Sequence, residues 1–235
     1  MDKLFIVTGS SKGLGKGLVD ALVKDHKVIG ISRTNDFQHS SFTWLKCDFS
    51  QPASIDSLDL NMEADEIILI NNAGWIGPVK HVGNQSSQEI VDLFNINVSS
   101  VFAITNKLVS WTKKTGNKLT VINVSSGAAT AVIDGWSAYC ASKAAINSFS
   151  EILQHESKLN KLPIRVHALS PGVIDSPMQA EIRNAESTDF SRVADFQGMK
   201  ENDELQTAKE TAEKVLFIID NPDRFSEVLV SVRDL

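Results

Sequence analysis

Residues 3–22 constrain the fold of this chain more than any other stretch. Residues 3–8 (KLFIVT) form an apolar run typical of a buried strand, and Gly9, Gly13 and Gly15 follow it. The apolar residues that come next have helical spacing: Leu14, Leu18, Ala21 and Leu22. Glycines permit a sharp bend and close approach of a ligand, and a helix amino terminus attracts phosphate. The pattern predicts a nucleotide-binding strand, turn and helix, although a simple tight turn explains the glycines alone equally well.

The rest of the chain repeats an alternation of strands and helices. Further strands are predicted at residues 27–32, 43–47, 66–71, 118–124, 164–169 and 227–232, with helical patterns between them. Such alternation in 235 residues, with no linker or internal repeat, predicts a single α/β domain over residues 1–235. We expect a Rossmann-type, doubly wound parallel sheet of about seven strands with helices on both faces. Residues 50–65 are short for a full crossover helix, so a truncated helix is expected there.

Residues 175–206 form a long connection that mixes charges with scattered apolar side chains. A connection of this length is usually functional, and its spacing permits short helices. We predict a lid over the substrate, with a structural flap or a partner surface as the alternatives. Trp75 and Trp136 are candidates to wall an apolar pocket, and core packing is the alternative for each.

Tyr139 and Lys143 are four residues apart in a helical pattern, and Ser126 lies thirteen residues before the tyrosine. Residues at this spacing share one helix face, so the lysine ammonium can lie beside the phenol. A nearby cation favours phenolate and moves the tyrosine pKa from about 10 towards neutrality, where it can exchange a proton with a carbonyl oxygen. A solvated helix pair is the commoner explanation of this motif when it stands alone.

Asn97 occurs within another helical pattern, which opens with a capping box, Ser86-x-x-Glu89. It lies on the apolar face, where a buried amide is unfavourable unless its polar atoms find partners. Asn97 is therefore either a satisfied core asparagine or a functional residue.

The second predicted strand ends at Ser32-Arg33, where dinucleotide folds present a side chain to the adenosine ribose. A neutral serine followed by arginine leaves room for a 2′-phosphate and supplies a planar cation, and Lys12 adds a second charge. NADP is favoured over NAD, unless both side chains are ordinary surface cations.

Together, these features resemble the short-chain dehydrogenase/reductase family from Lys3 to about Val232. The motifs that carry the resemblance are Thr8-Gly9-x-x-x-Gly13-x-Gly15, Asn71-Asn72-Ala73-Gly74, Pro171-Gly172, and the set Ser126, Tyr139 and Lys143. The resemblance implies an oxidoreductase in which Tyr139 is the acid/base and Lys143 modifies its pKa and binds the ribose. It implies that Ser126 holds the carbonyl oxygen and that Asn97 holds a water in a proton relay.

The resemblance also implies the residues that surround the cofactor. Asp48 would approach the adenine, Asn72 to Gly74 would flank the adenosine, and the backbone at Ile174 would meet the nicotinamide amide. The full implied set is Gly9, Ser11, Lys12, Gly13, Leu14, Gly15, Ser32, Arg33, Asp48, Phe49, Asn72, Ala73, Gly74, Tyr139, Lys143, Pro171, Gly172, Ile174 and Ser176. The substrate is expected to meet Ser126, Trp136 and Tyr139.

Residues 125–145 and 170–179 look most like the benzil reductase and sepiapterin reductase branch, whose members reduce vicinal dicarbonyls or pterin side-chain ketones with NADPH. The pterin-anchoring aspartate of that branch falls on Ser231 here, which disfavours a pterin. We therefore predict an NADPH-dependent reductase of a ketone or vicinal dicarbonyl. A non-catalytic NADP sensor on the same fold is the main alternative, and a methyltransferase is a weaker one.

Composition narrows the function classes. The net charge is −6, from 23 basic and 29 acidic residues, and no basic stripe is present, so nucleic acid is not an expected partner. No apolar run reaches a membrane span of about 18 residues, and the first residues lack a signal-peptide pattern. Cys47 and Cys140 imply no disulfide framework, and the five histidines show no metal-ligand spacing. We expect a cytoplasmic enzyme without a metal, and the family's habit of pairing helices implies a homodimer or homotetramer.

Overall fold

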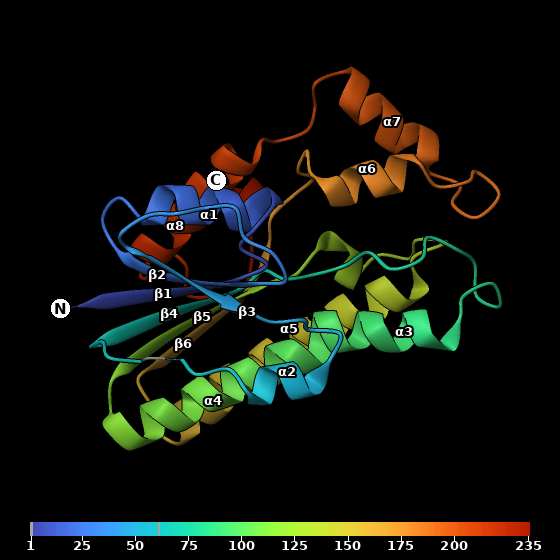
Figure 1. Ribbon diagram of the computed structural model, residues 1–235. Helices are drawn as coiled ribbons and strands as arrows, with labels where there is room; N and C mark the ends of the chain where they lie inside the picture. Colours follow the sequence, from blue (N-terminus) through green and yellow to red (C-terminus); the bar gives the residue numbers. More distant parts are fainter. Residues whose placement is uncertain (1, 61) are drawn as a thin grey trace.

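The computed structural model describes residues 2–60 and 62–235. One parallel sheet organises them, with the strand order β3-β2-β1-β4-β5-β6-β7 (Figure 1). The strands are β1 (Lys3–Thr8), β2 (Lys27–Ser32), β3 (Phe42–Lys46), β4 (Glu66–Asn71), β5 (Lys118–Val124), β6 (Ile164–Ser170) and β7 (Leu229–Ser231). The predicted doubly wound parallel sheet is confirmed. Only the last strand is clearly shorter than expected, because the chain turns into a 3₁₀ turn at Val232–Asp234.

Helices cover both faces of this sheet (Figure 1). On one face lie α1 (Gly13–Leu22) and α8 (Ala208–Asp220), and on the other lie α4 (Ser100–Thr115) and α5 (Ser137–Leu159). The remaining helices are α2 (Pro52–Asp56), α3 (Ser87–Phe94), α6 (Pro177–Arg183) and α7 (Val193–Glu201). In the part of the chain described, no helix is both long and apolar enough to cross a membrane.

The alternation of side chains along each strand builds two cores. Ile6 packs on the side of α4 and α5, with Leu108 and Leu153, whereas its neighbour Val7 packs on the other side with Leu18. Successive strand residues point to opposite faces, so an unbroken apolar strand supplies both layers. Burying one such side chain stabilises the folded state by about 1.5–3 kcal/mol, which explains why the central strands are continuous apolar runs.

The connection between β3 and β4 contains the truncated helix that its length predicted. Helix α2 has five residues, and Lys107 from α4 donates hydrogen bonds from its Nζ to the carbonyls of Ile55 at 2.7 Å and Asp56 at 3.0 Å. The lysine thus adds a donor to carbonyls at the end of this short helix.

Residues 175–206 leave the sheet and return to it. Asp175 N donates to the Gln206 carbonyl at 2.9 Å, and Gln206 N donates to the Val173 carbonyl at 3.1 Å. Between these joined ends the chain forms the two short helices that were expected, α6 and α7, which project beyond the carboxyl ends of the strands (Figure 1). We call residues 175–206 the lid.

Candidate active site

The glycine turn between β1 and α1 has a backbone that other residues would strain. Gly9 and Gly13 have φ of +66° and +52°, and a Cβ on Gly15 would lie 2.2 Å from the Gly9 carbonyl oxygen. Helix α1 starts at Gly13, and Lys12 makes no side-chain hydrogen bond that caps it. Its first N–H groups are therefore directed at the turn, where they suit an anion such as a pyrophosphate.

The Asn-Asn-Ala-Gly motif after β4 holds this turn in place. The Thr8 hydroxyl accepts hydrogen bonds from the N–H groups of Asn72 and Ala73, each at 3.0 Å. In return, Asn72 Nδ2 donates to the carbonyls of Thr8 at 2.9 Å and Gly9 at 3.2 Å. Two motifs more than sixty residues apart are thus locked together, and Thr8 supplies a contact that the sequence analysis did not assign.

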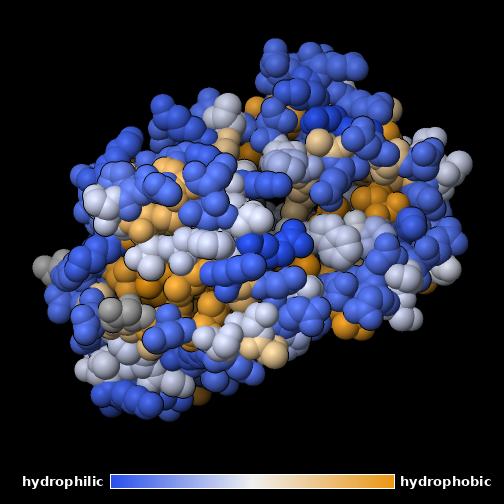
Figure 2. Space-filling model, in the orientation of Figure 1, coloured by the Kyte–Doolittle hydropathy of each residue, from blue (hydrophilic) through white to orange (hydrophobic). Residues whose placement is uncertain are grey.

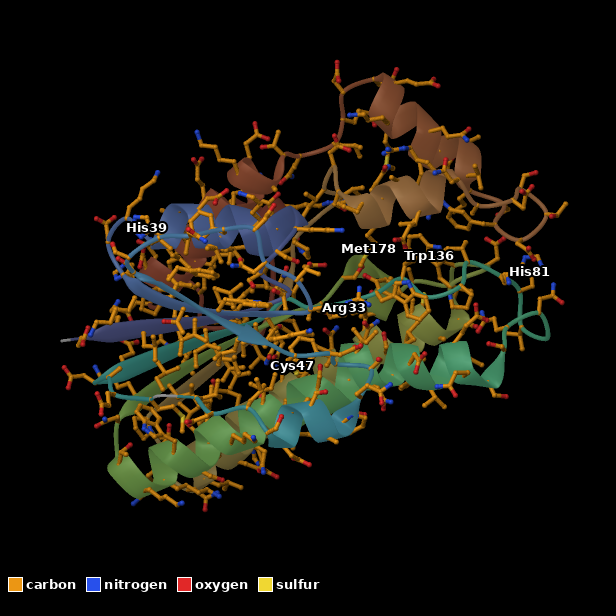
Figure 3. The ribbon with its side chains drawn as sticks, viewed as in Figure 1. Arg33, His39, Cys47, His81, Trp136 and Met178 are labelled. Atoms are coloured by element: carbon orange, nitrogen blue, oxygen red, sulfur yellow. The ribbon has the colours of Figure 1, made fainter. Side chains whose placement is uncertain are left out.

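At the end of β2, the two residues predicted to meet the adenosine differ. Ser32 is buried, and its hydroxyl donates to the Thr34 carbonyl at 2.7 Å while accepting from Trp44 Nε1 at 3.1 Å. Ser32 therefore anchors the loop that follows it. Arg33 and Lys12 are both exposed, and Figure 3 places Arg33 at the carboxyl end of the sheet.

Asp48, which follows β3, and the residues near Gly172, which follow β6, lie further out along the carboxyl ends of the strands. The Asp48 carboxylate accepts from the backbone N–H of Ser50 at 3.0 Å and from its hydroxyl at 2.9 Å, and Phe49 is buried. Gly172 has φ of +76°, and the Cβ of Ser176 would lie 3.6 Å from a Cβ on Gly13. The start of the lid therefore meets the glycine turn.

Asn97 lies in a single π-helical turn, Asn95–Ser99, which interrupts the long helix expected here and joins α3 to α4. Its Oδ1 accepts from Trp75 N at 2.8 Å, and its Nδ2 donates to the Trp75 carbonyl at 2.9 Å and to Ser142 Oγ at 3.1 Å. The side chain is thus satisfied, as a buried amide must be. A π-turn shifts the backbone bonding of a helix and occurs often at functional sites.

Tyr139, Lys143 and Asn97 converge beside Gly74. Tyr139 is 7% exposed and Lys143 is 4% exposed. A Cβ on Gly74 would lie 3.6 Å from Asn97 Oδ1 and 3.7 Å from Lys143 Nζ. Ser126 begins a short 3₁₀ turn and accepts from Ala128 N at 3.1 Å, which leaves its hydroxyl proton available to another acceptor. The structure therefore brings the predicted residues of the catalytic set into one region.

The predicted fall in the tyrosine pKa is wrong for this structure. Burial raises the pKa of Tyr139 to about 12, and the Ser126 hydroxyl opposes that rise only in part. Lys143 lies with its Nζ 5.6 Å from the centre of the Tyr139 ring and donates instead to the Val124 carbonyl at 2.8 Å. Burial also lowers the pKa of Lys143 to about 8. Removing the buried phenol from water therefore moves the Tyr139 pKa in the direction opposite to the one that the sequence spacing suggested.

Trp136 closes the site on the side of the lid. Its ring stacks on Phe190 with centres 5.3 Å apart and meets Phe196 edge-on at 5.4 Å. Figure 3 shows Met178 of α6 near Trp136, and Figure 2 shows apolar residues gathered beneath the lid helices. The indole ring also meets Tyr139 edge-on at 5.7 Å. Trp136 is therefore both a core residue of this cluster and a neighbour of Tyr139.

The comparisons with known proteins agree with this geometry. The family model for short chain dehydrogenases matches residues 3–187. The chain belongs to the short-chain dehydrogenase/reductase family. It is 33% identical to benzil reductase ((S)-benzoin forming) of Bacillus subtilis, with 93% of each chain covered. It is 30% identical to sepiapterin reductase of Bos taurus over 76% of this chain and 62% of that protein. A short-chain dehydrogenase/reductase from Saccharomyces cerevisiae superposes with a TM-score of 0.79 at 26% identity, over 98% of this chain and 96% of the other.

These likenesses confirm the family and its benzil reductase and sepiapterin reductase branch. An oxidoreductase of this family uses NAD or NADP, and the glycine turn with its uncapped helix start fits such a dinucleotide. Ser142, which binds Asn97, and the Val124 carbonyl, which binds Lys143, were not found from the sequence, because neither residue type signals its role without the fold.

Proposed function

We propose that this protein is an NADPH-dependent reductase of a ketone or vicinal dicarbonyl. The observation that carries the proposal is the convergence of Tyr139, Lys143 and Asn97 beside Gly74, under an apolar lid. The two relatives described above are named as reductases, and one of them is named for reducing benzil, an aromatic vicinal dicarbonyl. The intact catalytic set and these relatives leave a non-catalytic sensor unfavoured.

Each residue has a chemical task in this proposal. NADPH, held by the glycine turn and Lys143, would supply the hydride that the carbonyl carbon accepts. The Ser126 hydroxyl donates a hydrogen bond to the carbonyl oxygen, and the Tyr139 phenol gives that oxygen its proton, which yields the alcohol. A tyrosine kept protonated by burial suits this direction, because the phenol is ready as an acid at neutral pH. Lys143 contributes positive charge and a ribose contact, and Asn97 fixes the backbone at Trp75 beside the relay.

The choice of NADPH rests on charge at the adenosine end. Arg33 and Lys12 are exposed cations near the end of β2 and in the glycine turn, and Ser32 brings no carboxylate that would repel a 2′-phosphate. Arginine presents a planar fork that matches phosphate oxygens.

An apolar carbonyl substrate fits the lid better than a small keto acid does. Arg192 is exposed and pairs with Asp195 at 3.0 Å, and Arg183 lies 3.8 Å from Asp175. Arg192 therefore has a carboxylate of its own, and Arg183 is held near one although its buried Nη1 makes no hydrogen bond among the described residues. Aromatic rings, in contrast, surround Trp136.

A substrate panel that follows NADPH absorbance tests the proposal. We expect benzil to give a higher kcat/KM than pyruvate, because that ratio reports the difference in transition-state binding. NADPH should also support faster turnover than NADH at equal concentration. Absence of cofactor oxidation with every ketone and diketone would favour the sensor, and a preference for pyruvate would show that an arginine sets specificity.

We also propose that the protein pairs with itself through α4 and α5. Phe102 of α4 is 41% exposed and stacks on Phe149 of α5 at 3.8 Å, and Ile152 of α5 is 54% exposed. Exposed apolar side chains on adjoining helices support a homodimer or homotetramer. Light scattering that gives the mass of one chain at every concentration would contradict this.

The cysteines support the proposed cytoplasmic location. Cys47 and Cys140 are both free thiols. Burial raises the pKa of Cys47 to about 11 and also raises that of Cys140, so both favour the unreactive thiol form.

A further inference from the structure

The indole N–H of Trp136 is a buried donor whose partner is missing from the protein. Trp136 is 6% exposed, and its Nε1 makes no hydrogen bond among residues 2–60 and 62–235. A buried donor left unpaired is destabilising, and buried tryptophans usually find an acceptor. Trp44 shows the ordinary case, since its Nε1 donates to Ser32 Oγ at 3.1 Å.

Trp136 lies beside Tyr139, which places its indole N–H close to the proposed catalytic acid. Its ring centre lies 5.7 Å from that of Tyr139, with the two planes at 81°. Phe190, stacked on the indole at 19°, and Phe196, at 61°, hold the ring from the lid. The indole cannot turn without moving these rings, so its N–H is oriented before a substrate arrives. A fixed donor beside the catalytic acid is suited to a polar atom of the substrate that lies next to the reacting carbonyl.

We propose that Trp136 Nε1 donates a hydrogen bond to the second carbonyl oxygen of a vicinal dicarbonyl, while Tyr139 and Ser126 engage the first. This inference rests on the proposed function and specifies its substrate class. A vicinal dicarbonyl carries its second acceptor on the adjacent carbon, so one molecule satisfies both groups. A ketone without that oxygen leaves the indole N–H unpaired, and a site discriminates strongly against a substrate that leaves its buried polar groups without partners.

Kinetics of Trp136→Phe test the role of the N–H while keeping an aromatic ring. The two substrates are benzil and deoxybenzoin, which has the same two phenyl rings and lacks the second oxygen. We expect the ratio of kcat/KM for benzil to that for deoxybenzoin to fall about three- to tenfold, the range of one hydrogen bond. The matched control is Trp111→Phe, which removes an indole from the far core under α4 and should leave the ratio unchanged. An unchanged ratio in Trp136→Phe overturns the inference.

A second measurement reads the contact without turnover. The chain has four tryptophans, so ¹⁵N-labelled protein gives few indole N–H signals, and the one lost in Trp136→Phe identifies residue 136. With NADP⁺ present to prevent reduction, saturating benzil should move this proton signal downfield, and deoxybenzoin should leave it near its starting position. A signal that benzil does not move overturns the inference.

The two measurements separate the inference from the proposed function. Reduction of benzil with an unmoved Trp136 signal would keep the reductase and reject the contact. A moved signal without reduction of any carbonyl would keep the contact and reject the reductase.

Discussion

The glycine turn and the lid lie at opposite sides of the same site, and they are held by different forces. Hydrogen bonds fix the turn: the Thr8 hydroxyl and the Asn72 side-chain amide make four with neighbouring main chain, and Gly15 leaves no space for a side chain. Apolar packing fixes most of the lid: aromatic rings pack on Trp136, and exposed polar contacts lie at its edges.

The polar contacts at the lid are few and close to solvent. Asp134 accepts from Ser191 N at 2.7 Å and from Ser191 Oγ at 2.9 Å, which joins the lid to the body of the protein, and Lys200 pairs with Asp175 at 2.7 Å within the lid. Segments held in this way open at lower free energy than buried strands do. We therefore propose that the cofactor side is preformed, whereas the lid closes the substrate side through contacts that can be broken separately.

The largest expected effect comes from Tyr139→Phe, because Tyr139 lies between the glycine turn and the lid. The substitution removes the transferable proton and keeps the ring that packs on Trp136, so reduction should fall by about 10²-fold or more. Cofactor affinity should barely change, because the substitution leaves the glycine turn in place. Rates with benzil and a fluorescence titration with NADPH measure the two quantities, and near-normal turnover would reject the role of Tyr139.

The same contrast explains how much the sequence could predict. The strand, turn and helix at residues 3–22 follow from local rules, because glycine sterics and apolar periodicity act over a few residues. The capping box at Ser86 and Glu89 was confirmed for the same reason. The family resemblance placed the Asn-Asn-Ala-Gly motif beside the adenosine, and only the structure shows that Asn72 of this motif holds the turn.

Properties set by burial could not be predicted. The spacing of Tyr139 and Lys143 gives their shared helix face but not their desolvation, which decides the pKa of each. The π-turn at Asn97 depends on Trp75 and Ser142, which are distant in sequence. The stacking of Phe190 on Trp136 likewise requires the lid to be folded.

The next largest effect tests the cofactor side alone. Arg33→Ala should weaken NADPH binding by about ten- to a hundredfold and leave NADH almost unaffected, because one charge-assisted contact contributes about 1.5–3 kcal/mol. Arg192→Ala is the matched control, since Arg192 is an exposed arginine of the lid. Isothermal titration with both cofactors gives the affinities. Equal affinity of the unmodified protein for NADPH and NADH would contradict the assignment.

A third effect concerns the pH dependence of the reaction, which the burial of Tyr139 determines. With the pKa of Tyr139 raised to about 12, the phenol stays protonated below that pH, and the phenolate needed to oxidise an alcohol increases about tenfold for each pH unit. Oxidation of benzoin by NADP⁺ should therefore rise steeply between about pH 6 and about pH 7.5, while benzil reduction stays flat. Lys143, with a pKa of about 8, remains mostly charged over this range. A plateau of the oxidation rate near neutral pH would show that the lysine cation, and not burial, sets the tyrosine pKa.

The smallest expected effect comes from removing a contact that holds the lid. Asp134 joins the lid to the body of the protein through Ser191, and its hydrogen bonds to the Ser191 backbone and hydroxyl lower the pKa of its carboxyl. Because that pKa is depressed, the contact is present above the ordinary carboxyl pKa and is lost only in acid. Asp134→Ala should raise KM for benzil about two- to fivefold, the range of one or two exposed hydrogen bonds, with the NADPH affinity unchanged.

Asp195→Ala is the control, since it removes the same charge from a residue that pairs with Arg192 within the lid. If both variants change KM equally, surface charge and not the lid contact is responsible, and a fall in NADPH affinity in Asp134→Ala would show that the two sides are coupled.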